Sequence, residues 1–153
     1  GAERKIVTSL HLDPESLERT ITARNEKYDV IRKKETRYSV INPDADIIIV
    51  AYGTIARIVR SIIDEHNAEK EGFSLGLFCP LTLFPFPETE LYNISKGKKA
   101  VFTVEMSSGQ MVEDVRLAVL TNAPVKFWGR NGGIVPSAEE ISAQAKKIWE
   151  AVK

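Results

Sequence analysis

Two short polar segments lie where an apolar run gives way to a helical pattern, and they carry the residues best placed to do chemistry. Gly53-Thr54 follows one apolar run, and Met106 to Gln110 follows another that ends in Glu105. The free N–H groups and the positive dipole end at the start of a helix favour an anionic group. The candidate ligand-contacting residues are therefore Gly53, Thr54, Glu105, Ser108, Gly109 and Gln110.

Three of these residues also have local roles that compete with ligand binding. Glu105 can accept hydrogen bonds from the start of the next helix, which offsets the cost of burying its charge. Thr54 and Gln110 can satisfy N–H groups of their own helices, as residues at helix starts commonly do. The sequence favours the local role at all three positions.

Other residues with reactive side chains give weaker signals. Arg130 precedes a pair of glycines and could clamp a carboxylate or a phosphate, although a loop arginine is more often solvated or at an interface rim. His11 and His66 lie far apart without a cluster of ligands, so surface positions are expected and a metal site is not. Cys79 follows an apolar run with no cationic neighbour, which predicts a core position. No catalytic residue is expected.

Composition limits the classes of protein to which the chain can belong. A length of 153 residues with 43% hydrophobic content suits one domain plus an extension. The 21 basic residues balance the 21 acidic ones, so no net charge draws the chain to nucleic acid or an acidic membrane. The single cysteine excludes an internal disulfide and a cysteine-held cluster within this chain, and suggests a reducing cytoplasm.

The sequence contains no membrane-spanning or signal-peptide pattern. The most apolar stretch, 73–86, contains two prolines and is too short to cross a bilayer, and the N-terminus has no signal-peptide pattern. Gly1 before a charged segment is typical of a residue left by tag removal. Glycine-rich nucleotide loops, the Gly-x-Ser-x-Gly elbow and His-Glu-x-x-His are absent, so a self-contained nucleotide enzyme or hydrolase is not expected.

The elements that must position the candidate residues alternate along the chain. A charged helix is predicted over 13–35, with Asp13 as N-cap, Pro14 at the first helical position and a thin apolar stripe. Periodicity and turn signals then predict strands over 37–41, 46–52, 73–78, 99–105 and 124–128. They predict helices over 54–67, 87–94, 109–119 and from a capping box at Ser137-x-x-Glu140 onward. The chain thus divides into a linker with a helical extension, 1–36, and an α/β domain, 37–153.

Several strings in this frame resemble one family of enzymes. Val50-Ala-Tyr-Gly-Thr54, Pro80-Leu-Thr-Leu-Phe-Pro-Phe-Pro87 and Val104-Glu-Met-Ser-Ser-Gly-Gln-Met111 resemble the C-terminal domain of transketolase-like, thiamine-diphosphate-dependent enzymes. With Glu113 to Ala118 and Phe127 to Gly133, they resemble the α-subunit of 2-oxoacid:ferredoxin oxidoreductases. The extension Ile6 to Glu15 is similar to the linker of the branched-chain, 2-ketoisovalerate members, which connects the pyrimidine-binding domain to this one.

The resemblance implies a three-layer α/β/α fold around a five-stranded, mostly parallel sheet of order 1-3-2-4-5, with strand 1 antiparallel. In this order the crevice beyond the second and fourth strands is the topological switch point, where ligands of such sheets bind. The resemblance therefore brings Gly53-Thr54 and the segment 106–110 to the two sides of one crevice.

The resemblance also implies a function for the intact enzyme. It would decarboxylate a 2-oxoacid on thiamine diphosphate and pass electrons through iron–sulfur clusters to ferredoxin, leaving an acyl-CoA. The motif for the diphosphate magnesium is missing here and is expected on the β-subunit, so this domain binds no cofactor itself. Its expected partners are the missing pyrimidine-binding domain, the β, γ and δ subunits, and, through the complex, ferredoxin and coenzyme A. Its own role would be structural.

Two alternatives remain open from the residues. One is a free-standing flavodoxin-like or receiver-like module that holds a small anion in the switch-point crevice, although a receiver needs more acidic residues than Glu105 supplies there. The other is a dimerisation domain of another transketolase relative. The segment Leu81 to Pro87 carries more bulky apolar groups than loops usually do, which makes an interface there as plausible as core packing.

Overall fold

The computed structural model describes residues 3–4, 6, 10–69 and 72–153. It divides the chain into two compact units, Gly1–Glu35 and Thr36–Lys153. The predicted boundary between extension and domain lay between residues 36 and 37, one residue from this division. Every helix in the described part of the chain is too short or too polar to traverse a bilayer.

The first unit contains one long helix, α1 (Pro14–Glu35). Its start was predicted correctly: the Asp13 carboxylate accepts a hydrogen bond from Ser16 N at 2.8 Å, and Pro14 occupies the first helical position. Basic residues gather in the last turn, where they oppose the negative end of the helix dipole. No residue of α1 is buried, so local hydrogen bonds and capping, rather than a core, define this helix.

The second unit is a five-stranded sheet between two pairs of helices. The strands are β1 (Tyr38–Ile41), β2 (Ile47–Val50), β3 (Leu75–Pro80), β4 (Ala100–Glu105) and β5 (Val125–Gly129). Their order in the sheet is β1-β3-β2-β4-β5, with β1 antiparallel to β3 and the other pairs parallel. The predicted fold class is therefore confirmed, including the antiparallel first strand.

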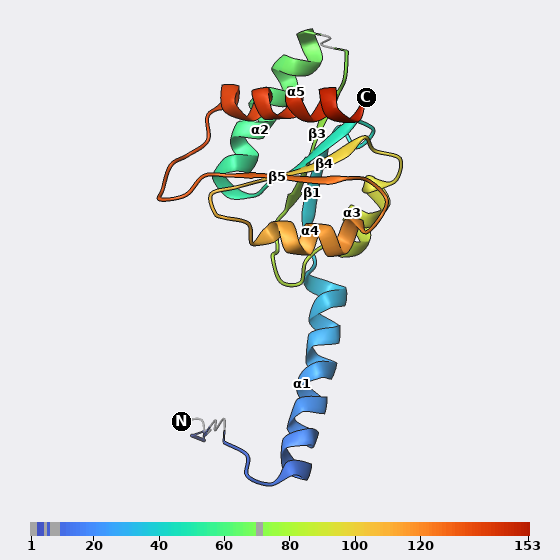
Figure 1. Ribbon diagram of the computed structural model, residues 1–153. Helices are drawn as coiled ribbons and strands as arrows, with labels where there is room; N and C mark the ends of the chain where they lie inside the picture. Colours follow the sequence, from blue (N-terminus) through green and yellow to red (C-terminus); the bar gives the residue numbers. More distant parts are fainter. Residues whose placement is uncertain (1–2, 5, 7–9, 70–71) are drawn as a thin grey trace. The chain divides into compact units, whose positions relative to one another are not determined.

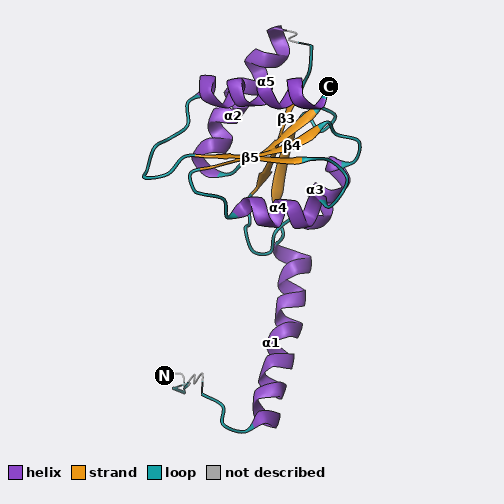
Figure 2. Cartoon of the chain, in the orientation of Figure 1, coloured by secondary structure: helices purple, strands orange, loops and turns teal. Residues whose placement is uncertain are grey.

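Helices cover both faces of the sheet, as Figures 1 and 2 show. α2 (Gly53–Glu69) and α5 (Ala138–Val152) lie on one face, and α3 (Glu88–Ser95) and α4 (Met111–Val119) lie on the other. The alternation of side chains along β2 explains its continuous apolar run: Ile47 and Ile49 enter the first core, and Ile48 and Val50 enter the second. Because β2 is covered on both faces, neither set of its side chains faces solvent.

The predicted strand over 73–78 begins later and runs further than expected. β3 starts at Leu75, because Ser74 forms hydrogen bonds with the side chain of Asp46, just before β2. The Asp46 carboxylate accepts hydrogen bonds from Ser74 N and Oγ, both at 2.8 Å, and Asp46 N donates to Ser74 Oγ at 3.0 Å. Phe73 instead stacks on Trp149 of α5, with ring centroids 5.1 Å apart.

Close approach of the backbone fixes one residue of β3. A Cβ at Gly76 would overlap the carbonyl oxygen of Asn42 in the turn between β1 and β2. The same turn is held by Asn42 Nδ2, which donates to Leu75 O at 2.9 Å. The turn predicted at Asn42-Pro43-Asp44 is thus confirmed, and it packs directly on the central strands.

Candidate functional site

A cleft of about 260 Å³ lies beyond the carboxyl ends of β2 and β4, the position that the strand order makes a switch point. Of the six predicted crevice residues, Gly53, Thr54, Glu105 and Gln110 line it, whereas Ser108 and Gly109 do not. The complete lining is Tyr52, Gly53, Thr54, Ile55, Val104, Glu105, Met106, Ser107 and Gln110.

The Glu105 carboxylate is a cap for α4 supplied by the strand that precedes it. Only 4% of Glu105 is exposed, and its two oxygens accept three backbone hydrogen bonds. Oε2 receives Gln110 N at 3.1 Å and Met111 N at 3.0 Å, and Oε1 receives Val112 N at 3.0 Å. A buried carboxylate is stable in this position because N–H groups and the helix dipole both favour its charge. The local role predicted for Glu105 is confirmed.

Ser107 completes this network and was not among the predicted residues. Its Oγ donates to Glu105 Oε2 at 2.9 Å and accepts from Gly109 N at 3.2 Å. Gly109 has a φ of 107°, a backbone conformation that only glycine adopts readily, so the loop can turn back over the carboxylate. A short hydroxyl side chain just before a helix start is the sequence signal that could have identified Ser107.

The occupied start of α4 changes the chemistry expected for the cleft. The N–H groups of the N-cap residue Gln110 and of the first two helical residues, Met111 and Val112, already bind a carboxylate, so they are not available to an anionic ligand. Glu105 is also the only ionisable acid or base of the lining, apart from the phenol of Tyr52. On the α4 side the cleft therefore favours a neutral, hydrogen-bonding group over a phosphate or a second carboxylate.

Two local roles predicted at helix starts are wrong. α2 begins at Gly53, whose φ of 59° makes the sharp turn out of β2, so Thr54 lies inside the first turn and is not the N-cap. The Thr54 hydroxyl accepts from Arg57 Nη2 at 3.4 Å. Gln110 is the N-cap residue of α4, but its side chain makes no capping hydrogen bond, because Glu105 has taken the N–H groups.

Neither Ser108 nor Arg130 lines the cleft: Ser108, in the loop between β4 and α4, faces the loop after β5 that contains Arg130. Ser108 Oγ donates to Asn131 Oδ1 at 3.0 Å. Arg130 Nη1 pairs with Glu140 Oε1 at 2.5 Å, and Glu140 Oε2 accepts from Ser137 N at 2.9 Å in the predicted capping box of α5. The Arg130 guanidinium thus already holds a carboxylate of its own chain.

The remaining reactive residues are structural. The surface position predicted for His66 is wrong: it is 5% exposed, its Nε2 lies 3.0 Å from Phe73 O, and its ring meets the Phe73 ring edge-on. The chain returns over the end of α2 and covers it, which the position of His66 in a helical pattern does not reveal. Cys79 is buried as predicted, and burial raises the pKa of its thiol despite Ser39 and Arg60 nearby.

The described residues contain no group of three or more histidine, cysteine or acidic side chains that could hold a metal ion. The cleft likewise offers no cationic side chain for a diphosphate. The side chains that line this cleft therefore do not fit a magnesium-bound diphosphate cofactor.

Comparison with known proteins places the chain in a family. Residues 45–141 match the family described as pyruvate:ferredoxin oxidoreductase core domain II. The ketoisovalerate oxidoreductase subunit VorB of Methanothermobacter thermautotrophicus is 42% identical over 146 residues, which is 95% of this chain and 41% of that relative. The chain thus spans less than half the length of this relative.

Two solved structures share the fold. A 2-oxoglutarate:ferredoxin oxidoreductase from Magnetococcus marinus, with 2-oxoglutarate, coenzyme A and succinyl-CoA bound, aligns over 90% of this chain and 24% of its own with a TM-score of 0.74. A split-gene transketolase aligns over 76% of this chain and 42% of its own with a TM-score of 0.62. Both are 20% identical to it. Sequence and fold agree: the chain belongs to the pyruvate:ferredoxin oxidoreductase core domain II family.

Proposed function

We propose that this chain is the C-terminal domain of the α-subunit of a thiamine-diphosphate-dependent 2-oxoacid:ferredoxin oxidoreductase, with 2-ketoisovalerate as the preferred oxoacid. In the intact enzyme the oxoacid loses carbon dioxide, the acyl group forms a thioester with coenzyme A, the thiol proton is released, and the electron pair passes to ferredoxin. The observation that carries the proposal is the 42% identity to a ketoisovalerate oxidoreductase subunit over 95% of the chain.

The role of this domain in that enzyme is structural. Its buried carboxylate and thiol are committed to the fold: Glu105 caps α4, and Cys79 lies in the core between the sheet and α2. The cofactors are accordingly held by other parts of the complex. Thiamine diphosphate and Mg²⁺ would bind between the pyrimidine-binding domain and the β-subunit, and the iron–sulfur clusters would belong to other subunits.

The partners follow from the same proposal. They are the pyrimidine-binding domain, the β, γ and δ subunits, and ferredoxin and coenzyme A as substrates of the complex in the cytoplasm. If this domain contacts a substrate or a neighbouring subunit, we expect the contact at the switch-point cleft, through Thr54 and Gln110. Both side chains line the cleft, and a neutral amide or hydroxyl group suits its charge.

The experiment compares the full α-subunit, purified with its partner subunits, with the 153-residue chain alone. The complex is expected to reduce ferredoxin when given an oxoacid and coenzyme A, with 2-ketoisovalerate giving more acyl-CoA than 2-oxoglutarate or pyruvate. The chain alone is expected to show no turnover and no heat of thiamine diphosphate binding in calorimetry. Stoichiometric micromolar binding of the cofactor to the chain alone would overturn the structural role.

The alternative of a free-standing anion-binding module finds less support. That module would use the start of α4 to hold its anion, and Glu105 already fills this position. An anion could bind at this position only by displacing the Glu105 carboxylate from its three N–H donors. Its own binding would have to offset the free energy lost when those hydrogen bonds break.

A further inference from the structure

The loop between β4 and α4 and the loop between β5 and α5 leave the sheet at the same edge, because β4 and β5 are parallel (Figure 1). Their backbones are in direct contact there. A Cβ at Gly129, the last residue of β5, would lie 2.2 Å from the carbonyl oxygen of Ser107, so only glycine fits at this position. Arg130 N also donates a hydrogen bond to Glu105 O at 3.1 Å. A movement of one loop is therefore felt directly by the other.

The turn at residues 131–135 has one side tied to this contact and one side open to solvent. Ser108 Oγ, from the loop before α4, donates to Asn131 Oδ1 at 3.0 Å. All five residues of the turn are exposed. Gly132 and Gly133 have φ values of 65° and 80°, and a Cβ on either would meet no atom within 4 Å. The outer side of the turn is thus accessible to another molecule.

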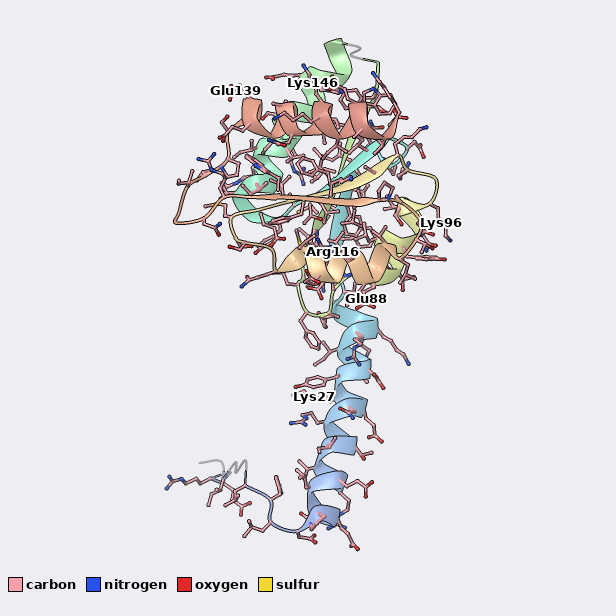
Figure 3. The ribbon with its side chains drawn as sticks, in the orientation of Figure 1. Lys27, Glu88, Lys96, Arg116, Glu139 and Lys146 are labelled. Atoms are coloured by element: carbon pink, nitrogen blue, oxygen red, sulfur yellow. The ribbon has the colours of Figure 1, made fainter. Side chains whose placement is uncertain are left out.

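Each of the two loops also holds the start of a helix. Ser107 donates to the Glu105 carboxylate, which caps α4, and Arg130 pairs with Glu140 in the capping box of α5. The two helices lie on opposite faces of the sheet. In Figure 3, Glu139 marks the start of α5, on the face opposite α4. One set of contacts at the sheet edge therefore connects two helix starts with the switch-point cleft.

We propose that residues 106–110 and 129–134 form one conformational unit, through which contact at the 131–135 turn changes the cap of α4 and thereby the switch-point cleft. The element with two states is the first turn of α4. In one state Glu105 holds the N–H groups of Met111 and Val112, as in this structure, and in the other these groups are released and the turn frays.

Such a coupling acts in both directions, so a ligand that fixes the cleft also fixes the turn. The inference goes beyond the proposed function, because it concerns the α/β domain alone and depends neither on an oxoacid nor on partner subunits. It can therefore be tested on the 153-residue chain itself.

The first test measures amide hydrogen exchange by NMR in Asn131→Ala. The hydrogen bonds of Asn131 do not include Met111 or Val112, yet the N–H groups of these two residues are expected to exchange about threefold faster, as the loss of one ordinary hydrogen bond allows. Exchange at Ile49, in the central strand β2, is expected to stay unchanged. Thr121→Ala is the matched control, because Thr121 is exposed in the turn at the other end of α4. It is expected to leave all three rates unchanged.

Gly129→Ala perturbs the same contact more strongly. Its new Cβ would overlap Ser107 O, so the loop before α4 has to move. Exchange at Met111 and Val112 is expected to accelerate about tenfold, because the displacement reaches the capping network directly. If this variant does not fold, Asn131→Ala decides the question by itself.

The second test places a bulky group on the turn. Ile134→Cys supplies an exposed thiol, since Ile134 is 50% exposed, whereas Cys79 is buried. Coupling this thiol to a polyethylene glycol maleimide is expected to change the exchange rates of Met111 and Val112 about threefold relative to the unlabelled variant. The same label on Thr121→Cys is the control and is expected to leave these rates unchanged.

Each other outcome overturns a distinct statement. Unchanged exchange at Met111 and Val112 in both loop variants would show that the two loops are independent. Equal acceleration at Ile49 would mean a global loss of stability, which also rejects a local unit. A label on the turn without effect on the cap would reject control by contact at the turn. An oxidoreductase complex that fails to reduce ferredoxin would reject the proposed function and leave this inference unaffected.

Discussion

At the scale of single residues, the feature that decides the chemistry of the cleft is a carboxylate used as a cap. Caps usually come from the residue that begins the helix, but here Gln110 occupies that position and Glu105, at the end of β4, supplies the oxygens. One side chain thus fixes the end of a strand, a five-residue loop and the start of a helix. This network fixes the shape of the cleft. It also occupies the N–H groups at the start of α4, which are therefore not available to an anionic ligand.

Replacing Glu105 by glutamine tests this role. The amide keeps the size of the side chain but has one accepting oxygen, so at least one of the N–H groups of Gln110, Met111 and Val112 loses its partner. We expect Glu105→Gln to lower the free energy of unfolding by about 1–3 kcal/mol, measured by urea denaturation. Glu113→Gln, which affects an exposed pair with Arg116, is the control and is expected to change it by less than about 0.5 kcal/mol. Equal stability of the two variants would contradict the capping role.

Asp46 links stability to pH. Burial alone would raise the pKa of its carboxyl, but hydrogen bonds from Ser74 and the charge of Lys99 outweigh burial and hold the pKa below its ordinary value of 3.8. A carboxyl with a depressed pKa stabilises the folded state above the unfolded pKa, and this contribution is lost as the pH falls through the folded pKa.

Asp46→Asn is therefore expected to be less stable than the wild type at pH 7, and the difference is expected to shrink below about pH 4. Urea denaturation at a series of pH values measures it. Asp44→Asn, in the exposed turn nearby, controls for the general effect of removing one acidic group. A difference between Asp46→Asn and wild type that stays constant down to pH 2 would show that the carboxyl contributes nothing through its ionisation.

The roles of site residues were predictable where they depend on neighbouring residues in the sequence. They were not predictable where they depend on contacts with residues further along the chain or on the backbone conformation of one glycine. The capping role of Glu105 follows from its position just before a helix, and the core position of Cys79 follows from its apolar surroundings. His66 was misplaced because Phe73, which packs against it, comes later in the chain than the helix that contains His66. Thr54 was misplaced because Gly53 begins the helix one residue early, through a positive φ that the sequence permits but does not require.

At the scale of elements, helix starts were predicted best where a side-chain motif marks them. The capping box at Ser137 and Glu140 is present as predicted, with Glu140 N donating to Ser137 Oγ at 3.2 Å and Ser137 N donating to Glu140 Oε2 at 2.9 Å. Strand ends shifted by one or two residues, because side chains such as Asp46 can take over the hydrogen bonds that the ladder would otherwise make.

Removing this box gives a prediction for α5. Ser137→Ala leaves Glu140 N without its acceptor, while the backbone N–H of residue 137 can still donate to the Glu140 carboxylate, which also pairs with Arg130. We expect a loss of about 1 kcal/mol in the free energy of unfolding, measured by urea denaturation. Ser142→Ala, within the same helix, is the control and is expected to be neutral or slightly stabilising, because alanine is the better helix former. A cost at Ser142 equal to that at Ser137 would mean that the box contributes nothing specific.

At the scale of the whole molecule, periodicity and family resemblance predicted different features of the fold. Alternating strands and helices predicted a parallel sheet covered on both faces, and the apolar run of β2 predicted a central strand. The order of the strands and the antiparallel direction of β1 came from the resemblance alone, because periodicity does not record which strand pairs with which. The loop between β3 and α3, residues 81–87, was also not predictable in detail: Phe86 packs on a core whereas Leu81 and Leu83 are exposed, a division that the sequence pattern does not record.

The division of the chain into two units predicts that the second folds by itself. Both apolar cores are built from residues 40–149, whereas α1 contributes no buried residue. Chain 36–153 is therefore expected to unfold in one cooperative transition, with a free energy of unfolding within about 1 kcal/mol of that of the whole chain. Residues 10–35 as a peptide are expected to be only partly helical in water, because a helix without a packed face is marginal at this length. Circular dichroism during urea denaturation measures both properties. If 36–153 failed to fold, or lost several kcal/mol, the extension would have to be an integral part of the domain.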